Sequence, residues 1–308
     1  MTLAVLCPGQ GAQHPALFDQ VGAHVEGARV IDDAARALGE DPRAWLEQGD
    51  VIYHNAIAQP LICVLQLAQW AWLRSQLPAP AALAGYSVGE LACYGVSGAL
   101  SAGEVARLAR ARATAMDAAA VTNPGGLIGV RGLSRPALHR LCEATRAFIA
   151  IATGDDAFVV GGSAAALDRI RERCESAGAK LTDLRVGIAS HTPLLAAAVD
   201  DFRIALERST LAAPTTPVIA GIDAGVVTTR DRAIATLSAQ ISHTVEWSQC
   251  LDALHERGCR VFVELGPGCA LSRILRERFD DVDARAIEEF RDFAGVARWV
   301  QRKMSELT

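Results

Sequence analysis

The chain has 308 residues, of which 51% are hydrophobic and 21% charged, and its formal net charge is −5. This length suits one large core, or a large domain that carries a smaller inserted one. The acidic balance and the lack of a polybasic run give no reason to expect a nucleic-acid partner. No apolar run approaches the ~20 residues of a membrane-spanning helix, so no membrane association is predicted.

The cysteines and histidines give no sign of disulfides or of a metal site. The eight cysteines form no Cys-x-x-Cys pair, and the apolar run at residues 1–7 is cut by Pro8 and Gly9 before it reaches the length of a signal peptide. Reduced, mostly buried thiols and a cytoplasmic location are therefore predicted. The seven histidines lack metal-ligand spacing, and no metal site is predicted.

The first predicted element is a wholly apolar strand over residues 3–7, typical of a parallel sheet. The loop Pro8-Gly9-Gln10-Gly11-Ala12-Gln13 follows it directly. Such loops gather ligands and catalytic groups in open α/β sheets, although these residues alone favour a plain turn. Residues 16–50 are predicted helical, and Gln59-Pro60 is predicted to open an apolar helix over residues 61–77 with its proline in the first turn.

Residues 84–90 read Ala-Gly-Tyr-Ser-Val-Gly-Glu and lie between an apolar run and a helical pattern. Gly-x-Ser-x-Gly in this context predicts a nucleophile elbow, in which two glycines permit a sharp turn and Ser87 is exposed at a helix N-terminus. The N–H groups there can stabilise an oxyanion. By itself the motif is weak, because many such matches have no catalytic role.

The pattern changes after Asn123-Pro124-Gly125-Gly126 to short elements in the order βαββαβ, which is that of a ferredoxin-like unit. The predicted fold class is α/β. A large α/β-hydrolase-like domain, with a parallel sheet and the nucleophile elbow, comprises residues 1–124 and 189–308. A small ferredoxin-like domain of residues 125–188 is inserted into it.

A nucleophilic serine needs a base, and His191 is the strongest candidate because the chain re-enters the main sheet at this point. His14 and His54 flank loops that can also lie near the site. Further apolar strands are predicted over residues 217–222 and 260–265.

Six motifs in order resemble the malonyl-CoA:acyl carrier protein transacylases and the acyltransferase domains of polyketide and fatty acid synthases. They are Pro8-Gly9-Gln10-Gly11-x-Gln13, Gln59-Pro60, Gly85-x-Ser87-x-Gly89-Glu90, Arg112, Ser190-His191 and Glu264-Leu265-Gly266-Pro267-Gly268. The resemblance covers essentially the whole chain. It implies an enzyme with no bound cofactor that takes a malonyl group from a coenzyme A thioester, malonyl-CoA. The group then passes to the phosphopantetheine thiol of a holo acyl carrier protein.

The resemblance also implies a role for each matching residue. Ser87 is the nucleophile and His191 the general base and acid, with the His191 ring oriented by the backbone carbonyl of Gln240. The backbone N–H groups of Gln10 and Val88 form the oxyanion hole.

Arg112 matches the position that binds the malonyl carboxylate, and a planar guanidinium suits a carboxylate through two parallel hydrogen bonds. Arg107 and Arg110, on the same predicted helix, fit a solvated helix face better. Gln59 matches a substrate-pocket position.

Tyr86 stands where most members of the family have histidine, so contacts with the acyl chain or thioester are expected to differ there. Three stretches most resemble the malonyltransferase (epsilon) subunit of bacterial malonate decarboxylase, which loads a small dedicated carrier subunit. They are the Tyr86 elbow, the Gly-Gln-Gly-Ala-Gln-His opening at residues 9–14 and residues 289–296. The alternatives are a hydrolase with the same Ser-His site, a transferase for another acyl group in polyketide biosynthesis, and a catalytically idle subunit. The presence of Arg112, Gln10 and His191 argues against the idle subunit.

Overall fold

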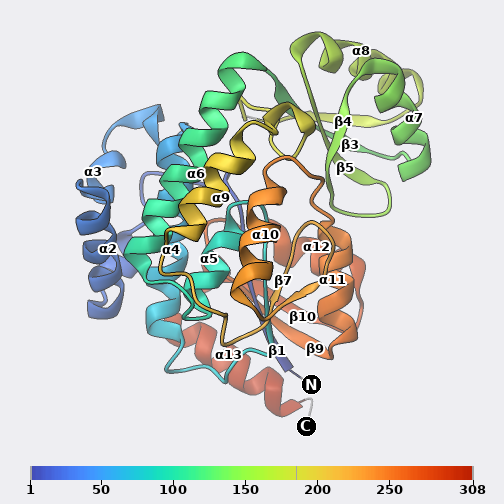
Figure 1. Ribbon diagram of the computed structural model, residues 1–308. Coiled ribbons are helices and arrows are strands. Elements are labelled where there is room, and N and C mark those ends of the chain that lie inside the picture. Colours follow the sequence, from blue (N-terminus) through green and yellow to red (C-terminus); the bar gives the residue numbers. More distant parts are fainter. Residues whose placement is uncertain (1, 185, 307–308) are drawn as a thin grey trace.

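The computed structural model describes residues 2–184 and 186–306. Figure 1 shows a larger body and, at the upper right in light green, a smaller lobe that contains β3, β4, β5, α7 and α8. Each part has its own sheet, six-stranded in the body and four-stranded in the lobe.

The six-stranded sheet has the order β10-β9-β1-β2-β7-β8, and only the β7–β8 pair is antiparallel. Its strands are β1 (Thr2–Cys7), β2 (Ala82–Gly85), β7 (Val218–Ile219), β8 (Val226–Val227), β9 (Cys259–Glu264) and β10 (Asp283–Ala286). β1 has β2 on one side and β9 on the other, so the strand order reverses there. Ligands of open α/β sheets bind at such a point, beyond the carboxyl ends of the strands.

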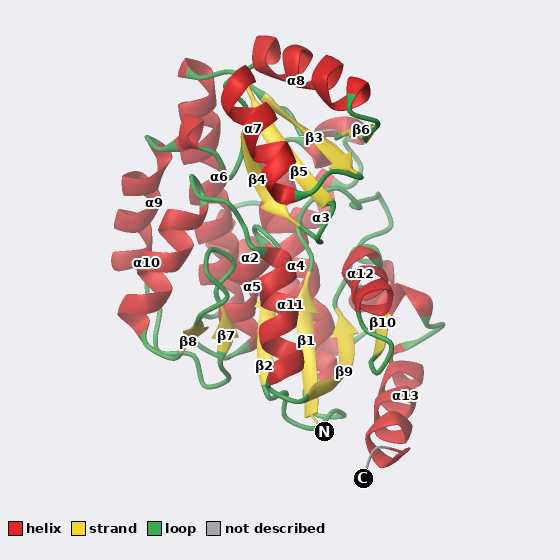
Figure 2. Cartoon of the chain, turned by 90° about the vertical axis from the view of Figure 1, so that its right-hand side faces the viewer, coloured by secondary structure: helices red, strands yellow, loops and turns green. Residues whose placement is uncertain are grey.

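Helices cover both faces of this sheet, which is why its strands are almost continuously apolar. Leu3 and Val5 of β1 face the layer that holds most of the helices, whereas Ala4 and Leu6 face α11 and α12. Figure 2 shows α11 in front of β1 and β2. The second layer consists of α11 (Trp247–Glu256) and α12 (Ala270–Arg278). The helices of the first layer are α1 (Asp19–Gly22), α2 (Val25–Leu38), α3 (Pro42–Trp45), η1 (Gly49–Tyr53), α4 (Asn55–Leu73), α5 (Gly89–Val96), α6 (Ala102–Thr122), η2 (Pro193–Leu195), α9 (Ala198–Glu207), α10 (Arg230–Gln240), η3 (Ile287–Glu289) and α13 (Phe293–Glu306).

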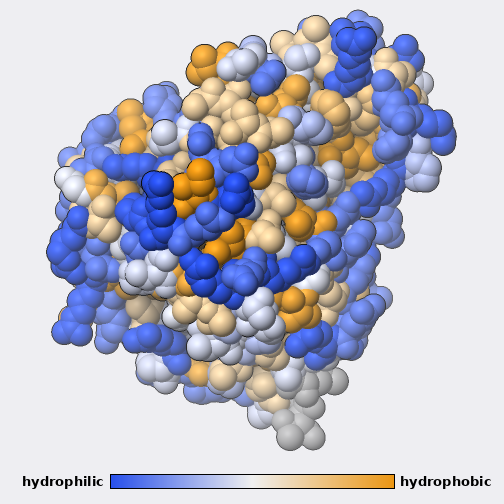
Figure 3. Space-filling model, in the orientation of Figure 1, coloured by the Kyte–Doolittle hydropathy of each residue, from blue (hydrophilic) through white to orange (hydrophobic). Residues whose placement is uncertain are grey.

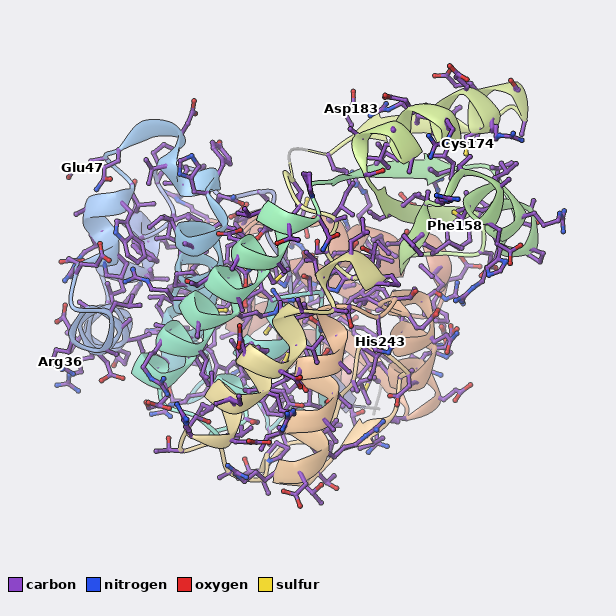
Figure 4. All side chains as sticks on the ribbon, turned by 45° about the horizontal axis from the view of Figure 1, so that its top comes forward. Arg36, Glu47, Phe158, Cys174, Asp183 and His243 are labelled. Atoms are coloured by element: carbon purple, nitrogen blue, oxygen red, sulfur yellow. The ribbon has the colours of Figure 1, made fainter. Side chains whose placement is uncertain are left out.

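The lobe follows the chain order βαββαβ, with the antiparallel sheet order β4-β5-β3-β6. Its elements are β3 (Gly126–Arg131), α7 (Arg135–Thr145), β4 (Phe148–Ala152), β5 (Ala157–Gly162), α8 (Ala164–Ser176) and β6 (Lys180–Asp183). Phe158 and Cys174, labelled in Figure 4, belong to a separate hydrophobic core between this sheet and its helices. The ferredoxin-like lobe and the α/β body confirm the predicted fold class.

α4 departs from the prediction in two ways. It begins at Asn55, more than one turn before the predicted start, so Pro60 lies inside the helix and not in its first turn. The helical hydrogen bonds begin before the proline, because the His54 carbonyl accepts from the N–H groups of Ile57 and Ala58. α4 is also long and apolar enough to cross a membrane by length and composition, contrary to the sequence-based expectation. Most of it is buried inside the protein, as in the core helix of a globular fold.

Hydrophobic and hydrophilic residues are interspersed on the face drawn in Figure 3. The large hydrophobic side chains that are exposed on the described surface lie on separate segments of the chain. They are Val25, Tyr53, Val121, Ile204 and Val226. This distribution gives no reason to place a partner on an apolar patch of the body.

Candidate active site

Ser87 lies in a sharp turn between β2 and α5. Its φ of 55° is in the left-handed region, which a non-glycine residue adopts rarely and mostly at functional turns. The flanking glycines are required by close backbone contacts. A Cβ on Gly85 would lie 2.1 Å from the Glu90 nitrogen, and one on Gly89 would lie 2.0 Å from the Cys7 oxygen. The predicted elbow is therefore built as a strained turn pressed against the end of β1.

Ser87 and His191 are in direct hydrogen-bond contact, with 2.8 Å between Ser87 Oγ and His191 Nε2. His191 Nδ1 lies 2.7 Å from the backbone oxygen of Gln240. A carbonyl only accepts, so Nδ1 carries the proton in the neutral ring and Nε2 is free to accept from the Ser87 hydroxyl. This tautomer is the one that can take a proton from serine.

Burial keeps the His191 ring neutral. The side chain is 1% exposed, and burial together with the nearby positive charge of Arg112 lowers its pKa to about 3, against the opposing effect of the Gln240 carbonyl. At neutral pH the ring is therefore unprotonated and available as a base.

Gln10 lies in the loop after β1, and Val88 is the residue before α5. Neither backbone N–H has an acceptor among the described residues. Side chains fix the loop on both sides of Gln10. Gln66 Nε2 donates to the Pro8 oxygen at 2.7 Å, and Gln13 Oε1 accepts from the Gly11 N–H at 2.7 Å. These two N–H groups come from the loops after the neighbouring strands β1 and β2.

Arg112, on α6, is 1% exposed and has no carboxylate within ion-pair distance in the described structure. It donates from Nη1 to Gln59 Oε1 at 2.8 Å and from Nη2 to Gln240 Oε1 at 3.0 Å. Burial lowers its pKa to about 10, so the guanidinium remains charged at neutral pH. A buried cation with only neutral partners is costly, and an anionic ligand compensates it.

The other two arginines of α6 differ from Arg112. Arg107 pairs with Glu104 at 3.0 Å and Arg110 with Glu40 at 2.8 Å, and all four side chains are partly exposed. These are surface ion pairs, as expected for a solvated helix face.

A cavity of about 460 Å³ joins these groups. Its lining includes the polar residues Gln10, Gln59, Ser87, Arg112 and His191. Apolar residues of the lobe, among them Leu127, Ile151 and Val159, also line it. The volume is that of a small-molecule site. No group of three or more His, Cys, Asp or Glu side chains that could hold a metal occurs within residues 2–184 and 186–306. The arrangement can acylate a serine with a group that carries a negative charge.

The acyl transferase domain model matches residues 5–299, nearly the whole chain. The chain belongs to the acyl transferase family. A malonyl CoA-acyl carrier protein transacylase of Mycobacterium bovis is 30% identical, with 96% of this chain and 99% of the relative covered. One of Salmonella typhimurium is 27% identical, with 93% and 96% covered. The solved malonyl-CoA:acyl carrier protein transacylase of Xanthomonas oryzae pv. oryzae superposes with a TM-score of 0.92 at 28% identity, with 98% of each chain covered. The predicted family is confirmed.

Tyr86 and the two alternative histidines are placed clearly in this acyl transferase. Tyr86 lines the cavity, and its ring packs edge-on against Trp247 with 5.4 Å between centroids. His14 instead lies 3.6 Å from Glu288, and neither His14 nor His54 lines the cavity. The structure therefore brings His191, and not these two, to Ser87.

Several polar residues that shape the acyl transferase site were missed from the sequence. Gln66 and Gln69 of α4 hold the loops after β1 and β9, since Gln69 Oε1 accepts from the Gly266 N–H at 2.7 Å. With Gln59 they are the buried amides of an otherwise apolar helix, and that contrast was a readable signal. Glu264 was part of a quoted motif, but its carboxylate accepts from the N–H groups of Leu271 and Ser272 and so caps α12.

Proposed function

We propose that this acyl transferase moves a malonyl group from malonyl-CoA to the phosphopantetheine thiol of a holo acyl carrier protein, through an ester on Ser87. The observation that carries the proposal is the buried Arg112, which shares a cavity with the Ser87–His191 pair. Among residues 2–184 and 186–306, its hydrogen-bond partners are two neutral amides. A guanidinium in that position recognises the free carboxylate of a malonyl group and disfavours acyl groups without one.

The first half-reaction acylates Ser87. His191 Nε2 takes the hydroxyl proton while Ser87 Oγ attacks the thioester carbonyl, and the N–H groups of Gln10 and Val88 stabilise the negative oxygen that forms. One such donor is typically worth about 10²–10³ in rate. When the tetrahedral intermediate collapses, the C–S bond breaks and the departing coenzyme A thiolate takes the proton from His191.

The second half-reaction reverses these roles. The carrier thiol gives its proton to His191 and its sulfur attacks the malonyl ester. The ester C–O bond breaks, and Ser87 Oγ recovers the proton from His191, so the enzyme returns to its starting state. The carbonyl of Gln240 keeps the ring in the required tautomer throughout, in place of the aspartate of a Ser-His-Asp triad.

For the carrier, we infer the small subunit of a malonate decarboxylase, acting in the cytoplasm. The support is the Tyr86 elbow, the opening at residues 9–14 and residues 289–296, which most resemble the malonyltransferase subunit of that enzyme. We further propose that residues 125–188 form a distinct inserted domain. Its separate hydrophobic core supports this division.

The test incubates the protein with malonyl-CoA labelled in the malonyl group, alone and with a holo carrier from malonate decarboxylase or from fatty acid synthesis. We expect label on the wild-type protein, no label on Ser87→Ala, and rapid transfer to the decarboxylase carrier. Release of free malonate at a rate that no carrier alters would instead identify a hydrolase. Faster loading of the fatty acid carrier would refute the decarboxylase assignment alone.

A further inference from the structure

The side-chain amides of Gln59 and Gln240, which accept hydrogen bonds from Arg112, each donate a further hydrogen bond on the side away from Arg112. A glutamine amide can present either its oxygen or its NH₂ group, and only the oxygen suits a guanidinium. Gln59 and Gln240 both present oxygen to Arg112. The cause of that orientation therefore lies in what their NH₂ groups contact.

Gln240 leads to a buried carboxylate. Its Nε2 donates to Glu90 Oε2 at 2.5 Å, and the same oxygen accepts from the Gly221 N–H at 2.9 Å. Glu90 is 0% exposed, and a Cβ on Gly221 would lie 2.8 Å from Glu90 Oε2. The backbone is thus shaped around this carboxylate, which lies directly after the elbow and is not within ion-pair distance of Arg112 in the described structure.

Gln59 is connected by hydrogen bonds to a second carboxylate, that of Asp117, through the side-chain amide of Asn55. Its Nε2 donates to Asn55 Oδ1 at 2.8 Å, and Asn55 Nδ2 donates to Asp117 Oδ1 at 3.0 Å. Asn55 and Gln59 are one turn apart on α4, and Asp117 is on α6, the helix that carries Arg112. Every donor in this chain points away from Arg112 and every acceptor toward it.

We propose that Glu90 and Asp117 are positioning residues for Arg112: each carboxylate fixes the amide chain in front of it so that a glutamine oxygen holds the guanidinium in place. The inference rests on the proposed function, in which Arg112 binds the carboxylate of the acyl group. Carboxylates in direct contact with Arg112 would compete with that substrate. Two carboxylates behind amides instead fix the direction of the guanidinium and leave its remaining N–H donors for the ligand.

Kinetics of five variants with malonyl-CoA and acetyl-CoA test the proposal. Glu90→Leu removes the acceptor at similar volume and releases the Gln240 amide, whereas Glu90→Gln keeps an acceptor and is the matched control. We expect Glu90→Leu to raise KM for malonyl-CoA about tenfold, as for the loss of about one hydrogen bond, with kcat and KM for acetyl-CoA near wild type. Glu90→Gln should stay within about threefold of wild type. Asp117→Ala, at a partly buried position, should act in the same direction as Glu90→Leu.

The remaining two variants are Arg112→Ala alone and the double variant that joins Glu90→Leu to Arg112→Ala. The quantity compared is the ratio of kcat/KM for malonyl-CoA to kcat/KM for acetyl-CoA. If Glu90 acts through Arg112, adding Glu90→Leu to Arg112→Ala leaves this malonyl-to-acetyl ratio unchanged. A further fall in that ratio, or equal losses with both substrates in Glu90→Leu and Asp117→Ala, would overturn the inference and show a general structural role. A normal ratio in both variants, beside a lost ratio in Arg112→Ala, would overturn it and leave the proposed function standing. Failure of the wild-type protein to take malonyl-CoA would overturn both.

Discussion

Replacing Arg112 by alanine tests the substrate assignment most directly. The guanidinium has five N–H donors, of which the described structure engages one on Nη1 and one on Nη2. A carboxylate bound through two of the others gains two hydrogen bonds to a charged group, each worth roughly 1.5–3 kcal/mol. At about 1.4 kcal/mol per tenfold, the loss of both corresponds to about 10²–10⁴ in kcat/KM for malonyl-CoA.

The assay compares kcat/KM for malonyl-CoA and acetyl-CoA in Arg112→Ala and in the wild type. Acetyl-CoA has no carboxylate and gains nothing from the guanidinium, so its kcat/KM should hold or rise, and the selectivity should fall by the same 10²–10⁴. Arg107→Ala is the matched control on the same helix, because Arg107 makes a surface ion pair worth at most about 1 kcal/mol. Arg112→Lys should have an intermediate selectivity, since lysine keeps the positive charge but cannot form the two parallel hydrogen bonds of a guanidinium. An unchanged malonyl-to-acetyl ratio in Arg112→Ala would refute the carboxylate-binding role.

Two further predictions concern the elbow and the base. Gly89→Ala places a Cβ 2.0 Å from the Cys7 oxygen, so we expect a loss of at least about 3 kcal/mol in the free energy of unfolding, measured by urea denaturation. Gly22→Ala, where nothing lies within 4 Å of the added Cβ, is its control, and equal stability of the two variants would contradict the clash. The pKa of His191 is lowered by burial and then by Arg112, so wild-type acylation by a neutral ester should lose rate only far below pH 6.5. In Arg112→Ala the pKa of His191 should rise, so the acid limb of the pH–rate profile should move to higher pH. An acid limb that stays in place would exclude an effect of the Arg112 charge on His191.

The elbow, the βαββαβ order and the buried strands were predictable because they rest on local pattern. Gly85 and Gly89 mark the turn in the sequence, and the run over residues 3–7 has the composition of a strand covered on both faces. The contact of Ser87 with His191 spans 104 positions, and it was anticipated chiefly from the resemblance to a family.

Other features were not readable because they depend on tertiary pairing. β10 contains alternating charged residues and β8 has two residues, so neither resembles a strand until β9 or β7 lies beside it. The same holds for Glu90. It follows the elbow motif as an apparent first-turn acid of a helix, and only the fold brings it to Gln240, 150 positions away.

Arg112 links recognition of the acyl group to the reactivity of the base. Its charge attracts a carboxylate, and the same charge lowers the pKa of His191. When a carboxylate binds the guanidinium, it compensates that charge, so the imidazolium that forms as Ser87 attacks is less disfavoured. A neutral acyl group in the same cavity leaves the positive charge uncompensated. We therefore expect discrimination between malonyl and acetyl groups to appear in kcat as well as in KM, because one buried cation both binds the substrate and sets the basicity of the residue that acts on it.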